Sequence, residues 1–310
     1  MSFCDLKSGQ CGDAPEEASL AVEASQPILR GEITYVTDPI CSHCWAMEPA
    51  WRKLRYHYGA QLELRHMYGG LLPGWAGFRD AGAGIGSPAD VAPHWAEVAS
   101  HYGQPIDPSV WLRDPLASSF PPSIAAHAVR LLVPEQEEAF LRRIREALFL
   151  EARNIARPEL LTTYAGELGI DVEQFTTLYT RGIAEQAFRR ELAEVRRLGV
   201  RGFPTLIISG SDRQPVVLHG SQNYKRLEET VLRVTGIPRA QRAPRPEEAL
   251  AAYGSGTTLE FAELLDVSRG EVGELLTANG ATRFEVAGDT LWLAPTAQLD
   301  LPKQLSASIV

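Results

Sequence analysis

The sequence predicts an α/β fold in which a large helical insertion interrupts a small β-sheet. Alternating apolar and polar residues, the period of a half-buried strand, occur at residues 28–36, 62–67 and 204–218. Between about residue 70 and residue 200, apolar residues instead recur at threes and fours, which is the period of a helix. The chain has 310 residues, enough for a substantial core and a second module.

Composition and charge are those of an ordinary globular protein. The hydrophobic fraction is 45%, the charged fraction 22% and the formal net charge -9. The negative balance argues against non-specific binding to nucleic acid or anionic membranes, and no apolar run approaches the roughly 18 residues of a membrane span. Because residues 1–30 also lack the basic start and apolar stretch of a secretory signal, we expect a cytoplasmic protein with no membrane or nucleic-acid partner.

The N-terminal part is predicted to contain a tail, two strands and a helix. Residues 1–27 lack periodicity and are rich in Ala, Glu, Ser and Gly, so we expect a flexible tail that carries two cysteines. The strands are predicted at Ile28–Val36 and Leu62–Met67. The helix between them is predicted over Ser42–Tyr58, with a kink at Pro49 because proline lacks the donor of the helical hydrogen bond.

A helical region follows, and then a hairpin and a last helix. The hairpin comprises strands Pro204–Ile208 and Val216–Leu218 around a turn at 209–212, and the helix Asn223–Val234 completes a main domain of residues 28–236. The insertion, about residues 70–200, is predicted to contain helices Ala89–Tyr102, Ser123–Leu132, Glu135–Ala152, Pro158–Leu168 and Ile183–Leu198.

A stretch rich in proline and arginine, residues 237–249, is predicted to be a linker between domains. Residues 250–296 then have the pattern of a small helix–turn–helix with a two-stranded wing, before a tail at 297–310. A DNA reader needs positive charge on its recognition helix, but Glu271 and Glu274 oppose only Arg269. We therefore expect this module to pack or to contact protein.

The sequence Cys41-Ser42-His43-Cys44 lies where the first strand passes into a helix. A helix N-terminus has unsatisfied N–H groups and a partial positive charge, which favour a thiolate. Cys41 is therefore predicted to be the attacking thiolate, and the less exposed Cys44 the thiol that resolves a mixed disulfide. His43, when protonated or donating a hydrogen bond, is predicted to stabilise the Cys41 thiolate and to make the pair more oxidising.

The alternative for a CxxC motif is half of a structural zinc site, which needs two further ligands. Cys4 and Cys11, the other two of the four cysteines in the chain, are the candidates for those ligands. The direct passage from strand to apolar helix favours redox chemistry, so we predict no metal. A second disulfide, a metal with outside ligands and a thiol relay to Cys41 and Cys44 stay open for the tail cysteines.

The second candidate element is Gly202-Phe203-Pro204-Thr205, directly before a strand. Proline is tolerated at the first position of a strand because its missing donor costs least there. A cis bond at Phe203–Pro204 would hold the loop against the dithiol and leave backbone groups free for a substrate chain. Since cis bonds are a small minority of X–Pro bonds, the residues alone favour trans.

These two elements together resemble a known superfamily. A CxxC at a strand–helix junction, followed far along the chain by Gly-Phe-Pro-Thr before a hairpin and a helix, resembles the thioredoxin superfamily, and the helical insertion resembles its DsbA-type branch. The segments TDPICSHCWAMEPAWRKL, GGLLPGW and GVRGFPTLIIS resemble the cytoplasmic DsbA-family group that includes FrnE-like oxidoreductases and the YjbH/SpxH adaptors. The resemblance covers roughly Leu29 to Gly236.

The resemblance implies a thioredoxin-like fold with a DsbA-type insertion, to which the small C-terminal helix–turn–helix and wing are added. It also implies that Cys41 is the nucleophile, Cys44 the resolving thiol and Pro204 a cis-proline. In periplasmic DsbA proteins the motif is CPHC, and Ser42 replaces that proline here. The residues expected to tune the site or contact a substrate are Ser42, His43, Trp45, Phe203 and Thr205.

Three functions are compatible with these residues. The first is a protein disulfide isomerase or thiol–disulfide oxidoreductase that acts on protein or small-molecule thiols without an organic cofactor, with glutathione as a candidate thiol partner. The second is a non-enzymatic protease adaptor or redox sensor of the YjbH/SpxH type that binds a client protein. The third, which we rank last, is a glutathione-dependent isomerase or transferase. Loss of function in Cys41→Ser distinguishes the first from the second.

Other motifs carry weaker expectations. Glu48 follows Cys41 by seven residues and so returns to nearly the same helical face; we expect it to pair with a base rather than to accept a proton. The apolar loop at residues 69–75 either lines a groove or packs on the core. The glycines at 82–86 lack a preceding strand, so we predict no nucleotide site there.

Overall fold

A computed structural model of the chain describes residues 3–4, 11–12, 30–211, 213–239 and 242–295. Among these residues, no helix is long and apolar enough to cross a membrane. Two short strands, β1 (Phe3–Cys4) and β2 (Cys11–Gly12), pair antiparallel within the segment predicted to be a tail.

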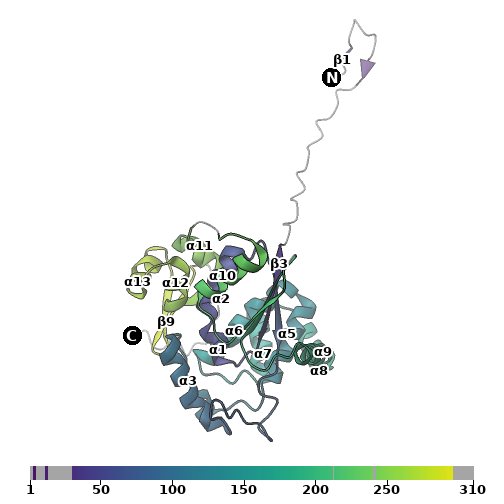
Figure 1. Cartoon of the computed structure of the whole chain (residues 1–310), viewed down its shortest axis with the longest axis vertical. Coiled ribbons are helices and arrows are strands. Elements are labelled where there is room, and N and C mark those ends of the chain that lie inside the picture. The colour runs from purple at the N-terminus through teal and green to yellow at the C-terminus, as the bar shows by residue number, and fades with distance from the viewer. Residues whose placement is uncertain (1–2, 5–10, 13–29, 212, 240–241, 296–310) are drawn as a thin grey trace.

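A four-stranded mixed sheet in the order β4-β3-β5-β6 forms the centre of the main domain (Figure 1). Strand β3 (Gly31–Thr37) is parallel to β4 (Glu63–Tyr68) and antiparallel to β5 (Thr205–Gly210), and β6 (Val216–His219) pairs antiparallel with β5. Each predicted strand forms within a few residues of its expected position. Because β4 and β5 are neighbours of β3, the sheet brings the CSHC segment next to the Gly-Phe-Pro-Thr segment.

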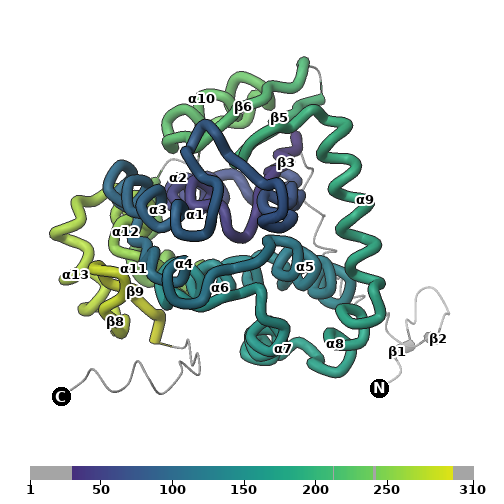
Figure 2. The backbone as a smooth tube through the Cα atoms, turned by 90° about the horizontal axis from the view of Figure 1, so that it is seen from below, coloured from purple at the N-terminus to yellow at the C-terminus, as the bar shows by residue number. Residues whose placement is uncertain are grey.

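Alternate side chains of β3 face two different layers of helices, as the period of a strand requires. Ile33 and Tyr35 lie in a core shared with helices α2 (Glu48–Tyr58) and α10 (Tyr224–Thr235). Val36 points the other way and contacts Val195 of helix α9. Figure 2 shows α9 along one side of the sheet and the layer of α1, α2 and α10 on the other.

The helix after β3 is two helices rather than one kinked helix, which corrects the sequence prediction. Helix α1 (Ser42–Ala46) ends at Met47, and α2 begins at Glu48. Pro49 therefore lies in the first turn of α2, where its missing N–H has no intrahelical acceptor to lose. The physical effect of the proline is as expected, but it starts a helix instead of bending one.

The insertion is helical, as predicted, and contains two helices that the sequence did not reveal. Helices α4 (Val110–Arg113) and α8 (Val172–Thr180) were missed. The predicted Glu135–Ala152 helix is shorter and is preceded by the 3₁₀ turn η1 (Pro134–Gln136). The remaining helices of the insertion are α3 (Pro88–Tyr102), α5 (Phe120–Leu132), α6 (Glu137–Phe149), α7 (Pro158–Glu167) and α9 (Ile183–Arg197).

The C-terminal segment forms further helices and a small sheet. Helix α11 (Pro246–Tyr253) begins inside the stretch predicted to be a linker, because proline fits the first turn of a helix. The predicted helix pair and hairpin form, and a short strand that was not predicted joins the hairpin in the order β7-β9-β8. These elements are β7 (Ser255–Thr257), α12 (Thr258–Leu265), α13 (Arg269–Ala278), β8 (Thr282–Val286) and β9 (Asp289–Leu293).

Buried ion pairs join this segment to the main domain through Glu260 of α12. Its side chain is 1% exposed and accepts hydrogen bonds from Arg52 of α2 at 2.7 Å and from Arg142 of α6 at 2.6 and 2.9 Å. Gln104 donates at 2.7 Å and the Thr257 backbone N–H at 2.9 Å. We call these five residues the Glu260 cluster. The predicted domain boundary therefore separates two segments that share a buried interface.

Candidate functional site

Cys41 and Cys44 lie at the start of α1, beside the end of β3, and both are free thiols. Cys41 is the N-cap residue, and its sulfur accepts a hydrogen bond from the Cys44 backbone N–H at 3.3 Å. This contact satisfies one of the helix N–H groups that have no intrahelical partner. Cys41 is 5% exposed and Cys44 is 0% exposed, so only Cys41 is offered to a reacting molecule.

The electrostatics of the pair differ from the sequence expectation. Burial, followed by the hydrogen bond with Cys44, raises the pKa of the Cys41 thiol well above its usual value. Burial also raises the pKa of Cys44, but the hydrogen bond from Cys41, the Arg145 guanidinium and the Thr37 hydroxyl outweigh it, so the net shift is downward. The two sulfurs thus titrate as a pair in which negative charge gathers at Cys44. The predicted lowering of the Cys41 pKa is wrong for this closed, reduced arrangement.

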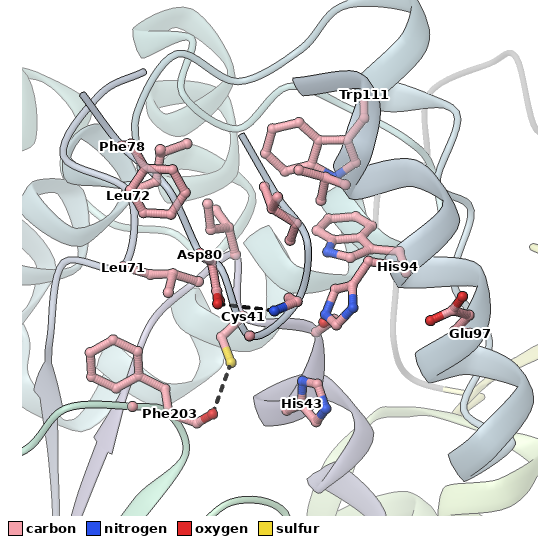
Figure 3. A pocket seen from close by; sticks show the side chains of 18 of the residues that line it. Cys41, His43, Leu71, Leu72, Phe78, Asp80, His94, Glu97, Trp111 and Phe203 are labelled. Atoms are coloured by element: carbon pink, nitrogen blue, oxygen red, sulfur yellow. Dashed lines mark hydrogen bonds between the residues drawn. The ribbon is translucent and has the colours of Figure 1, made fainter. Parts of the chain in front are cut away.

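The Phe203–Pro204 segment lies against the dithiol. The Cys41 thiol donates to the Phe203 carbonyl oxygen with a sulfur–oxygen distance of 3.6 Å, drawn in Figure 3, and the Phe203–Pro204 peptide bond is cis. Thr205 is fully buried, and its hydroxyl donates to the Gly202 carbonyl at 2.8 Å. Of this segment, Phe203 is in contact with the reactive sulfur, while Thr205 holds the turn.

A cavity of about 700 Å³ opens beside Cys41, and the predicted Gly69–Trp75 loop forms part of its wall. The volume is in the range of sites that enclose small molecules or large side chains. Figure 3 shows Leu71, Leu72 and Phe78 on one side of Cys41 and His94 and Trp111 on the other. The apolar lining comprises Ile40, Leu71, Leu72, Trp75, Phe78, Ile85, Val91, Trp95 and Trp111, and the polar lining includes His43, Asp80, His94, Glu97 and Arg201.

The residues inside and after the motif have separate environments. His43 lines the cavity, and burial together with the nearby His94 and His101 lowers its pKa. It is therefore mainly neutral at pH 7, which removes the predicted effect of a protonated imidazole there. Ser42 also lines the cavity but is 4% exposed. Trp45 points away from the cavity into the core, where its indole N–H donates to the Pro105 carbonyl at 2.8 Å, so it makes no direct contact with a molecule in the cavity.

A buried guanidinium lies close enough to the dithiol to interact electrostatically with both sulfurs. Arg145 of α6 donates to Glu48 at 2.6 Å, to the Thr37 hydroxyl at 2.6 Å and to the Asp38 carbonyl at 3.2 Å. We call these four residues the Arg145 cluster. Glu48 is paired with a base, as predicted. Arg145 was not predicted, because a single arginine in an amphipathic helix has no signal that separates it from an exposed one.

Asp38, the residue before the Pro39 turn, was also missed as a site residue. Its carboxylate accepts from the backbone N–H groups of Ile40 at 3.0 Å and Leu71 at 2.7 Å and from the Ser119 hydroxyl at 2.9 Å. Asp38 therefore connects the turn before Cys41 to the loop of residues 69–75, which forms part of the cavity wall. Burial raises its pKa to about 6, against the lowering effect of these hydrogen bonds. Its position in a turn was the only available signal.

The described part of the chain contains no group of three or more His, Cys, Asp or Glu that could hold a metal ion. This does not test the zinc alternative, which needs Cys4 and Cys11. The side chains of Cys4 and Cys11 lie outside what the structure describes, so their roles stay open. The glycines at residues 82–86 lie in a loop closed by a bridge between Asp80 and Ile85.

Comparison with known proteins finds one matching family model and several relatives that share one name. The family model described as Thioredoxin matches residues 35–229. The ClpXP adapter protein SpxH of Halalkalibacterium halodurans is 30% identical over 277 residues, which cover 88% of this chain and 89% of that protein. The protein of the same name from Bacillus subtilis is 27% identical over 246 residues, covering 78% and 80%.

Solved structures match about two thirds of the chain. The cytosolic disulfide reductase DsbM from Pseudomonas aeruginosa superposes with a TM-score of 0.52 at 27% identity, over 65% of this chain and 98% of that chain. Its complex with GSH superposes with a TM-score of 0.51. A DsbA oxidoreductase from Streptomyces coelicolor, 18% identical with a TM-score of 0.52, shares the fold. By the family model, the SpxH relatives and this fold, the chain belongs to the thioredoxin family, in its DsbA-type branch and in the group that contains the SpxH proteins.

Proposed function

We propose that this chain is a thiol–disulfide oxidoreductase that uses Cys41 and Cys44. One observation carries the proposal: Cys41 lines a cavity and receives a helix N–H at its sulfur, while Cys44 lies buried one turn further on. A dithiol with one accessible and one protected sulfur is suited to attack followed by release. The 27% identity with a disulfide reductase over the main domain is consistent with this chemistry.

The proposed cycle needs only the two sulfurs and a substrate disulfide. The Cys41 thiolate attacks one sulfur of the substrate, a Cys41–substrate disulfide forms, and the first substrate thiolate leaves with the bonding electron pair. Cys44 then attacks the Cys41 sulfur and releases the second substrate thiol. The substrate gains two electrons and two protons, which the dithiol loses. Oxidation of a substrate dithiol runs the same steps backwards.

The decisive experiment is a redox equilibrium of the full chain against glutathione buffers, with free thiols trapped by alkylation. It uses a Cys4→Ser/Cys11→Ser background, so that only Cys41 and Cys44 respond. A defined two-electron midpoint that disappears in Cys41→Ser supports the proposal. Unreactive thiols, or co-purification of stoichiometric zinc, would falsify it.

A protease adaptor is the second candidate function, and the extent of the matches favours it. The Thioredoxin model ends at residue 229, and the disulfide reductase covers 65% of this chain. The SpxH relative covers 88%, so its similarity continues into the C-terminal segment. A segment that lies beyond the end of the Thioredoxin model, and that is shared with proteins named as ClpXP adapters, is a reasonable place for protein contacts.

The two functions respond differently to loss of Cys41. We expect an adaptor to bind purified ClpXP or its client with unchanged affinity in Cys41→Ser, because binding then depends on surface and not on sulfur. We expect an oxidoreductase to lose turnover of a model disulfide in the same variant. Isothermal titration calorimetry of wild type and Cys41→Ser, with a disulfide-reduction assay in parallel, distinguishes the two functions. As part of the oxidoreductase function, we also propose that the substrate is a protein, that glutathione is a thiol partner and that the chain works in the cytoplasm.

A further inference from the structure

Arg145 is the most deeply buried of the arginines near the dithiol, and its surroundings are unusual. Its side chain is 1% exposed. It comes from α6 of the helical insertion, yet it reaches the last residue of β3, Thr37, and the backbone of Asp38. Cys41 donates its own backbone N–H to that same Asp38 carbonyl at 3.2 Å. Arg145 thus holds the turn that positions Cys41.

The hydrogen bonds of Arg145 do not use all its donors. One terminal nitrogen donates to Glu48 and the other to Thr37 and Asp38. The Nε–H is buried and has no hydrogen-bond partner among the described residues. An unpaired buried donor is costly, so a purely structural guanidinium would be expected to use it.

The charge of Arg145 is only partly compensated. Among the described residues, Glu48 is its one carboxylate partner at hydrogen-bond distance, and Glu48 also lies 3.7 Å from Arg142. One carboxylate is thus shared between two guanidinium groups. The titratable groups that face Arg145 from the elements around it are Tyr35, Asp38, Cys41, Cys44, Glu48 and His66.

We propose that Arg145 is a positioning residue that supplies the counter-charge for the Cys44 thiolate when Cys44 resolves the mixed disulfide. This inference rests on the oxidoreductase function proposed above. Cys44 has no exposed surface, so water cannot stabilise its negative charge. A buried cation is needed instead. Arg145 donates to Thr37 and to the Asp38 carbonyl, which also accepts the Cys41 backbone N–H, and its charge lowers the pKa of Cys44.

The step that Arg145 assists is the second half of the cycle. The Cys44 thiolate forms a bond with the Cys41 sulfur as the bond between Cys41 and the substrate breaks. The electron pair of that bond leaves on the substrate sulfur, which takes a proton from solvent. Arg145 neither gives nor takes a proton; its fixed charge lowers the cost of the thiolate that must form before the attack.

The test uses the glutathione equilibrium of the full chain in the Cys4→Ser/Cys11→Ser background, measured above the pH at which the wild-type thiolate forms. Arg145→Met removes the charge that stabilises the reduced, ionised pair. We expect the equilibrium constant to move toward the disulfide by about tenfold, which is about 30 mV for two electrons. Release of glutathione from the Cys41 mixed disulfide should slow by a similar factor.

Two further variants separate charge from shape. Glu48→Gln removes the carboxylate that neutralises Arg145, so we expect the equilibrium to move in the opposite direction, toward the dithiol. Arg145→Lys keeps a positive charge, and we expect it to restore part of the wild-type value. A role limited to holding the turn predicts neither the opposite sign nor the rescue.

Arg143→Met is the matched control, because Arg143 is on the same helix, 4% exposed and paired with Glu151 and Glu167. We expect it to lower stability and to leave the equilibrium constant unchanged. The inference is overturned if Arg145→Met and Glu48→Gln shift the constant by less than twofold, or if Arg143→Met shifts it as much. A wild-type chain without any defined midpoint would instead defeat the oxidoreductase proposal, and this inference with it.

Discussion

Helix α6 supplies a guanidinium to each of two buried ion clusters, and the two are built differently. In the Glu260 cluster, every nitrogen of Arg142 donates: Nε to Glu146 at 2.7 Å, and both terminal nitrogens to Glu260. In the Arg145 cluster, Nε has no partner among the described residues and two of the acceptors are a hydroxyl and a carbonyl. The first arginine is saturated by carboxylates, whereas the second keeps part of its charge uncompensated.

This difference indicates whether a buried ion cluster mainly stabilises the fold or acts electrostatically on a neighbouring group. A buried pair whose donors are all satisfied holds its elements in one arrangement, and its loss is felt as lost stability. A buried cation that is only partly neutralised acts on whichever nearby group can become negative. The Glu260 cluster fastens the C-terminal segment to α2 and α6, and the Arg145 cluster lies against the dithiol.

The largest expected effect is on stability, in Glu260→Gln. The change leaves Arg52 and Arg142 buried without their carboxylate, and breaking such a buried pair typically costs about 3–5 kcal/mol of the free energy of unfolding. Urea unfolding followed by tryptophan fluorescence measures the loss. Glu185→Gln is the control, because the exposed Glu185–Arg189 pair should be worth about 0.5 kcal/mol or less. A loss below about 1 kcal/mol in Glu260→Gln would contradict the fastening role.

Each cluster contains a residue with a shifted carboxylate pKa, Glu260 in one and Asp38 in the other. The two shifts should make the free energy of unfolding depend on pH in opposite directions. Burial opposes ionisation of Glu260, but Arg142 and then Arg52 lower its pKa from 4.5 to about 2. Its stabilisation is therefore present above pH 4.5 and is lost as the pH falls toward 2, a change of about 3 kcal/mol. Glu260→Gln should lack this decline.

Asp38 should behave in the reverse sense. Burial raises its pKa from 3.8 to about 6, so ionisation costs more in the folded state than in the unfolded one. Stability should therefore fall as the pH rises from about 4 to 6, by about 2–3 kcal/mol. Unfolding curves of wild type and Asp38→Asn across this interval measure it. If both proteins have the same pH profile between 4 and 6, the pKa of Asp38 is not raised in the folded protein.

Arg145→Met should cost less stability than Glu260→Gln, about 2 kcal/mol. The reason is that Glu48 keeps Arg142 at 3.7 Å when Arg145 is removed, so no carboxylate is left without a cation. The same unfolding experiment provides the value. Equal losses in the two variants would mean that the Arg145 cluster and the Glu260 cluster stabilise the fold to the same degree.

The smallest effect is expected at the dithiol itself, in Gly69→Ala. A Cβ at residue 69 would lie 2.0 Å from the Phe203 ring, so the ring must move, at a cost of about 1 kcal/mol. Because the Phe203 carbonyl accepts from Cys41, we expect the alkylation rate of Cys41 to change as well. Gly202→Ala is the matched control, since its added Cβ has no neighbour within 4 Å. If both variants alkylate at the wild-type rate, Phe203 does not limit access to Cys41.

The sequence predicted the strands of the main sheet and most of the helices, because strand alternation, helix spacing and turn residues are local signals. The residues alone favoured a trans Phe203–Pro204 bond, and only the family resemblance implied the cis-proline that is observed beside Cys41. Helix α8 was missed because its β-branched and aromatic residues, as in Phe175-Thr176-Thr177, have low helix propensity. Glu260 completes a local capping box with Thr257. Nothing in that local motif reveals that the same carboxylate also binds Arg52 and Arg142, more than a hundred residues away.

The position of Glu260 late in the chain has a consequence for the order of events during synthesis. Arg52 and Arg142 leave the ribosome long before Glu260, and domains generally begin to fold from the N-terminal side as they emerge. Until Glu260 has been made, these two guanidinium groups, which are buried in the complete fold, must stay hydrated. The Glu260 contacts are therefore added to a domain in which the Arg145–Glu48 pair can already join α6 to α2.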